Sequence, residues 1–193
     1  MDLSRKLEDK LVLGDKTYFL NLSFDNVMRI FEMWQDNAVP DEVKSYLALR
    51  ILTGQVIEDL DPVEAIEIFM EIFEEVIQLD DNEEEIEYDL AGNVMKSTNS
   101  SGEKPSKTRL YNLKHDGDYI YPSFLQAYQL DLFEQQGKLH WLKFNALLAG
   151  LPDGTKFVEV VKIRSYKPSN GESNDYIEEM KRLQKVYKLP EDE

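Results

Sequence analysis

The residues DPVEAIEIFMEIFEEVIQL, at positions 61–79, constrain most strongly how this chain can fold. Asp61 and Pro62 are typical of a helix start, and at about 100° per residue the polar side chains then fill an arc of only about 100°. Those polar residues are Glu64, Glu67, Glu71, Glu74, Glu75 and Gln78. Because the rest of the circumference is apolar, the helix either lies at the centre of a bundle or keeps part of its face for a partner.

Helical spacing of apolar residues predicts further helices on both sides of this segment. They are expected over residues 24–36 with Ser23 as N-cap, from Pro40 to Gly54, from Pro122 to Tyr128, and over residues 138–149, 153–166 and 175–187. Residues 10–22 differ, because leucine and tyrosine alternate with polar residues around Gly14-Asp15, which predicts a β-hairpin. The expected fold class is therefore mainly α, with helical bundle units and a small N-terminal β-hairpin.

Charge and composition divide the chain into two parts. Residues 1–100 contain 8 Lys/Arg against 24 Asp/Glu, a net charge of −16, whereas residues 101–193 contain 14 of each. Residues 81–107 are acidic and then Gly/Ser-rich, with too few apolar residues to offset the cost of ordering. We therefore predict an acidic hairpin-plus-three-helix unit over 1–80, a linker or mobile loop over 81–107 with a short helix near Tyr88, and a helical C-terminal unit over 108–193.

The composition also argues against several function classes. The chain has no cysteine, which removes disulfides, thiol nucleophiles and cysteine-ligated zinc. The acidic first half repels phosphate backbones, so nucleic acid is not an expected partner. The sequence contains no run of about 18 apolar residues that could span a membrane. The first residues also lack the apolar region of a signal peptide. We therefore expect a cytoplasmic protein without a membrane partner.

Candidate chemistry is confined to two histidines, His115 and His140. A metal site that joins them with Asp116 or Asp118 is conceivable, but the spacing matches no known ligand pattern. The acidic run from Asp80 has a glutamate where a calcium-binding EF-hand loop requires glycine. Phosphate-binding glycine motifs and the nucleophile-elbow motif are absent. We therefore predict no enzyme, no cofactor and no metal, and interpret the chain as an interaction protein.

The stretch LHWLKFNALLAGLP, residues 139–152, is the second strongly apolar helix. One face contains Trp141, Phe144, Leu148 and Leu151, and a second contains Leu139, Leu142, Ala146 and Ala149. Gly150 is predicted to adopt the left-handed conformation that ends a helix, and Pro152 prevents its continuation. Because the helix is apolar most of the way round, we expect it at the centre of its domain.

The block 119–164 resembles the C-terminal core of a protein family from tailed phages of Gram-positive bacteria. The residues that carry the resemblance are Ser123-Phe124, Gln126, Tyr128, Asp131-Leu132, Gly137, Leu139-His140-Trp141, Phe144, Leu147-Leu148, Gly150-Leu151 and Ile163-Arg164. That family is encoded in the tail-gene module and is regarded as a tail assembly chaperone.

The resemblance implies a protein of the host cytoplasm that binds the tape measure protein, the long helical chain that sets tail length. It would keep this client soluble, promote polymerisation of the tail tube around it, and be absent from the finished virion. The alternative is a structural tail or connector component of the virion. Contact with the major tail protein and self-association are left open.

Partner-binding candidates come from the two strongly apolar helices. They are Trp141, Phe144 and Leu148 in the second unit, and Phe69, Phe73, Glu67, Glu71 and Glu74 in the first. Their apolar side chains would contact the apolar face of a client helix, and the glutamates would meet lysine or arginine at its edge. The apolar members serve equally well as core residues, so the sequence leaves both interpretations open.

Overall fold

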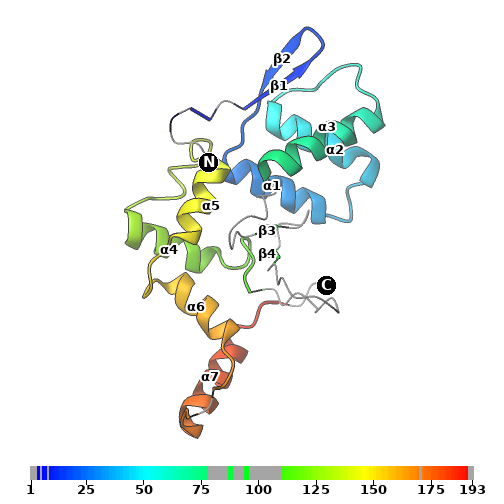
Figure 1. The fold of residues 1–193 in the computed structure, drawn as a ribbon. Coiled ribbons are helices and arrows are strands. Elements are labelled where there is room, and N and C mark those ends of the chain that lie inside the picture. Colours follow the sequence, from blue (N-terminus) through cyan, green and yellow to red (C-terminus); the bar gives the residue numbers. More distant parts are fainter. Residues whose placement is uncertain are drawn as a thin grey trace.

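The computed structural model describes residues 4, 6–7, 9–77, 87–88, 94–95, 110–169 and 171–190. In this part of the chain the fold is mainly α, as predicted from the sequence (Figure 1). The helices are α1 Phe24–Gln35, α2 Asp41–Thr53, α3 Pro62–Ile72, a π-helical turn Phe73–Ile77, α4 Gly117–Tyr128, α5 Trp141–Ala149, α6 Lys156–Ser165 and α7 Asn174–Val186. None of the described helices is long and apolar enough to cross a membrane.

The predicted N-terminal hairpin is present. Strands β1, Lys10–Leu13, and β2, Lys16–Phe19, are antiparallel with Leu11 opposite Tyr18. Gly14 lies in the turn with a φ of 57°, a left-handed conformation that a glycine adopts without steric cost.

A second short pair lies within the segment predicted to be a linker. Strand β3, Glu87–Tyr88, pairs antiparallel with β4, Val94–Met95. The prediction of a short helix near Tyr88 is therefore wrong, because Tyr88 lies in a strand opposite Val94. The rest of the predicted linker, 81–107, lies outside the described residues.

Two of the start and stop signals of the first three helices act as the sequence indicates, and a third does so in part. Gly54 ends α2 with a left-handed φ of 71°. Asp61 accepts hydrogen bonds from the N–H groups of Val63 and Glu64, and the Glu64 side chain accepts one from the Asp61 N–H, which is a complete capping box. Ser23 occupies the N-cap position of α1, but its side chain makes no capping hydrogen bond.

Three helices begin three or more residues from the predicted position, among them α6, which starts at Lys156 rather than at residue 153. Helix α4 starts at Gly117 rather than Pro122, which lies inside it. Pro122 has no N–H, so the helix forms without the hydrogen bond that this position would otherwise donate. Helix α5 starts at Trp141 rather than near residue 138, because His140 is its N-cap and accepts a hydrogen bond from the Leu142 N–H at 3.1 Å.

Gly150 does not adopt the predicted left-handed conformation, since its φ is −86°. Glycine is needed there for space instead. A Cβ at this position would lie 3.2 Å from the Ala146 carbonyl oxygen and 3.4 Å from the Tyr128 hydroxyl, which itself donates to the Leu147 carbonyl at 2.8 Å. The glycine therefore allows α4 and α5 to approach closely.

One continuous core joins the segments on both sides of the predicted linker. The Phe144 ring of α5 lies between two others, with centroids 5.0 Å from Phe24 of α1 and 5.3 Å from Phe124 of α4. The backbone is connected as well, because the Trp141 N–H donates to the Leu22 carbonyl at 2.7 Å. The division into two units stays a prediction, but both sides contribute to the same core.

The C-terminal helices are attached through Arg164. Its guanidinium makes a bidentate ion pair with Asp116, at 2.6 and 2.8 Å, and donates to the carbonyls of Leu110 and Tyr187. The side chains of Arg164 and Asp116 are 9% and 1% exposed. Helix α7 has no fully buried residue and lies at the opposite end of the molecule from the hairpin (Figure 1). This junction holds it together with the hydrogen bonds that Gln184 donates to the carbonyls of Arg164 and Tyr166.

Replacing this arginine should destabilise the fold strongly. In the variant Arg164→Met, Asp116 keeps a buried charge without its partner, so we expect a loss of about 3–5 kcal/mol in the free energy of unfolding, measured by urea titration. Arg182→Met is the matched control, because Arg182 pairs with Glu179 on the exposed side of α7, and its loss should stay below about 1 kcal/mol. Equal losses in the two variants would contradict the assigned role of Arg164.

Candidate functional site

The apolar residues predicted to contact a partner lie in the core. Trp141 and Phe69 are 0% exposed, and Phe144, Leu148 and Phe73 are 2–3% exposed. The Trp141 ring meets Phe144 with centroids 5.8 Å apart, and its indole N–H donates to the Ile77 carbonyl at 3.0 Å. The structure thus brings all five into the shared core, where they stabilise the junction between the π-helical turn and α5.

The predicted glutamates lie elsewhere. Glu67, Glu71 and Glu74 are exposed along α3 and its π-helical turn, next to the exposed side chains of Val63 and Ile66. No ion pair joins any of the three to another described residue. Contact of these glutamates with a partner stays a prediction.

His140 has a structural role, whereas His115 is exposed. The Nε2 of His140 lies 2.8 Å from an Asp9 carboxylate oxygen, and its Nδ1 accepts from Leu142, so both ring nitrogens are engaged. Asp116, a candidate metal ligand in the sequence, is held by Arg164. Among the described residues no group of three or more His, Asp or Glu side chains is arranged to hold a metal ion.

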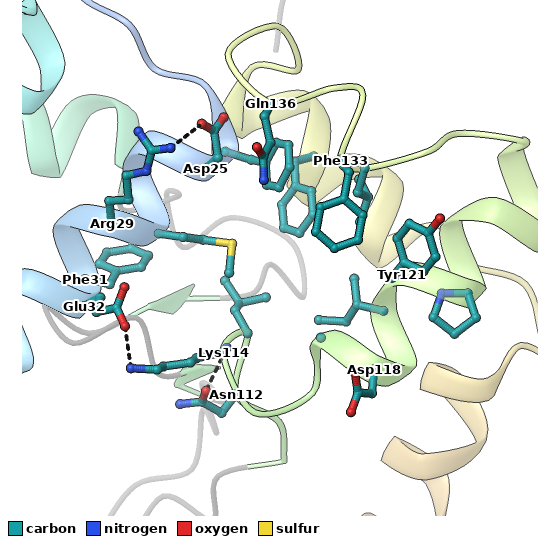
Figure 2. A pocket seen from close by; sticks show the side chains of 18 of the residues that line it. Asp25, Arg29, Phe31, Glu32, Asn112, Lys114, Asp118, Tyr121, Phe133 and Gln136 are labelled. Carbon is teal, nitrogen blue, oxygen red and sulfur yellow. Dashed lines mark hydrogen bonds and ion pairs between the residues drawn. The ribbon is translucent and has the colours of Figure 1, made fainter.

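The candidate functional site is an apolar groove of about 630 Å³ between α1 and α4 (Figure 2). The apolar residues that line it are Phe24, Phe31, Leu113, Ile120, Leu132 and Phe144, all buried, with Met28 half-buried. Phe133, in the loop between α4 and α5, lines it as well and is 69% exposed. Large exposed aromatic residues beside an apolar cavity are typical of binding sites rather than of ordinary surface.

The α1 side of the groove carries charges that are already paired. Asp25 lies 3.8 Å from Arg29 and accepts a hydrogen bond from the Gly137 N–H at 2.8 Å. Glu32 pairs with Lys114 at 2.6 Å. Figure 2 shows both ion pairs along the edge of the groove.

The α4 side is different. Tyr121 presents its ring to Phe133, with centroids 5.2 Å apart, and donates its hydroxyl to Asp131 at 3.2 Å. Burial, and then the Asp131 carboxylate, raise the pKa of the Tyr121 hydroxyl above its usual value of 10.0, so this hydroxyl keeps its proton at neutral pH. Asp118 lines the same side, is exposed, and makes no ion pair with another described residue.

The floor of the groove consists of the buried apolar side chains named above. The nearby Asn112 amide oxygen already accepts hydrogen bonds from the N–H groups of Lys114 and His115. An apolar surface of this kind suits the apolar side chains of a ligand or partner.

Sequence reasoning named one residue that lines this groove, Phe144, as a partner contact and missed the others. The lining comes from α1, from residues 112–122, from residues 132–136 and from α5, which the local periodicity treats separately. A useful signal was Phe133, which lies between the acidic and polar residues of DLFEQQG and belongs to no helical stripe.

The assignment of Trp141 to the core leads to a stability prediction. Trp141→Phe removes the indole hydrogen bond and leaves the buried Ile77 carbonyl without a donor, so we expect a loss of about 2–4 kcal/mol in urea unfolding. Trp34 is the matched control, because it is only half-buried and stacks on Phe69 with a centroid distance of 4.9 Å. Trp34→Phe should cost less, and unchanged stability of Trp141→Phe would show that Trp141 is not a core anchor.

Comparison with known proteins gives one family. The sequence model of the family described as Bacteriophage Gp15 protein matches residues 7–189. No curated protein and no solved structure gives a significant match. The matched region includes the hairpin, α1 to α7 and every residue that lines the groove.

Proposed function

The chain belongs to the bacteriophage Gp15 family, and we propose that this phage protein is a tail assembly chaperone that binds the tape measure protein. The observation that carries the proposal is the open apolar groove between α1 and α4. In this proposal the protein acts in the host cytoplasm, without a cofactor or an enzymatic step, and leaves before the virion is complete.

The physical demands of such a role agree with the groove. A long helical client exposes apolar faces until the tail tube covers them, and those faces drive aggregation. A groove with an apolar floor and a charged edge covers one stretch of such a face while its edge remains hydrated. The formal net charge of −16 makes loaded complexes repel one another, which keeps them soluble.

Co-expression tests the proposal directly. The full chain is expressed together with the tape measure protein of the same phage, and the tape measure protein is expressed alone as the control. We expect the tape measure protein to be insoluble alone and to co-purify with the chain when both are present. If it stays insoluble and nothing co-purifies, the chaperone proposal is wrong.

Mass spectrometry of purified virions separates this role from that of a structural component. A chaperone should be missing from finished particles, whereas a tail or connector component should be present at a fixed ratio to the major tail protein. Detection of the chain at a fixed ratio would replace the chaperone with the structural alternative.

A further inference from the structure

The two sides of the groove differ in how their charges are used. On the α1 side, Arg29 and Lys114 each have a carboxylate partner within the chain. On the α4 side, Asp118 has no such partner among the described residues and is exposed at the groove's edge (Figure 2). The groove therefore offers one uncompensated negative charge, on one side only.

We propose that the groove binds an amphipathic helix with a lysine or arginine on the flank that faces α4, and that Asp118 is the residue that selects this cation. The inference deepens the proposed function in one respect, since it describes the client segment that the groove would take. It also stands as a statement about the groove itself, because its residues and charges do not depend on which protein supplies the helix.

A helix is the occupant that the floor favours. The groove lies between the helices α1 and α4, whose backbone groups bond within their own helices, so neither of these two elements presents a strand edge to an extended peptide. A bound extended strand would therefore leave its own polar backbone groups without partners, at a cost for each. A helix satisfies these groups internally and presents large apolar side chains at intervals of three and four residues.

A cation is the charge that the edge favours. A client carboxylate would compete with Asp25 and Glu32 for Arg29 and Lys114, whereas a client lysine or arginine would meet Asp118 without competition from an ion pair among the described residues. The net negative charge of the first hundred residues also attracts a positively charged client over a longer distance. Because the pair forms at an exposed edge, it contributes modestly to affinity and mainly fixes the orientation of the helix.

A pair of designed peptides tests this inference without the natural client. Both peptides are helical with the same leucine face, and they differ only in a flank of lysine or of glutamate. Binding to the full-length chain is measured by isothermal titration calorimetry at fixed ionic strength. We expect the lysine-flank peptide to bind about five- to tenfold more tightly than the glutamate-flank peptide.

Variants then assign this preference to Asp118. Asp118→Lys should abolish or reverse the preference, while Glu178→Lys, the same charge change on the exposed surface of α7, should leave it unchanged. Met28→Trp places a larger side chain in the groove and should weaken the binding of both peptides equally. Phe133→Ser gives the same test without touching the core, because the Phe133 side chain is mostly exposed.

The outcomes separate the two proposals. Equal effects of Asp118→Lys and Glu178→Lys would overturn the role of Asp118, and full binding in both Met28→Trp and Phe133→Ser would overturn the groove. A tape measure protein that still co-purifies with these groove variants leaves the chaperone function intact and the groove wrong. If the designed peptides behave as expected but the tape measure protein never co-purifies, the inference holds and the proposed function fails.

Discussion

The contact between residues 22–24 and 139–141 is the interaction on which the rest of the structure depends. Two short backbone hydrogen bonds join segments more than a hundred residues apart, from the Trp141 N–H to Leu22 and from the Phe24 N–H to Leu139. Each neighbouring side chain then has a separate task. His140 caps α5 and binds Asp9, while the Trp141 indole reaches the end of the π-helical turn. These two hydrogen bonds hold α1 against α5 independently of the side chains that line the groove.

The groove follows from that arrangement. With α1 and α5 fixed, the stack of three phenylalanine rings places α4 at a set distance from α1. The Asp116–Arg164 ion pair then holds the loop that carries Lys114, and the Asp25–Gly137 hydrogen bond holds the loop that carries Phe133. Because both sides and both loops are restrained within the chain, the groove is formed before a partner arrives, which lowers the entropic cost of binding.

Local signals predicted the helices well and the site poorly, for physical reasons. The capping box at Asp61 and the glycine after α2 are decided by neighbouring residues, so they can be read in sequence order. The start of α4 was misplaced because a proline, usually a boundary, is tolerated one turn inside a helix. The aromatic stripes could not be assigned to core or contact, since both uses require the same spacing. The groove forms by packing between segments that are distant in the sequence. The spacing of apolar residues within one segment gives no information about such packing.

The composition of the groove also bears on how the proposed chaperone would release its client. The groove shares Phe24, Phe31 and Phe144 with the core, and its edge adds a half-buried methionine and an exposed phenylalanine, side chains that adapt to different apolar partners. Apolar area then sets the strength of binding, while exposed charge pairs add little energy and mainly direct orientation. In the proposed function, a complex held in this way would form quickly with many similar helices. It would dissociate when a larger apolar surface, such as a polymerising tube, competes for the same face.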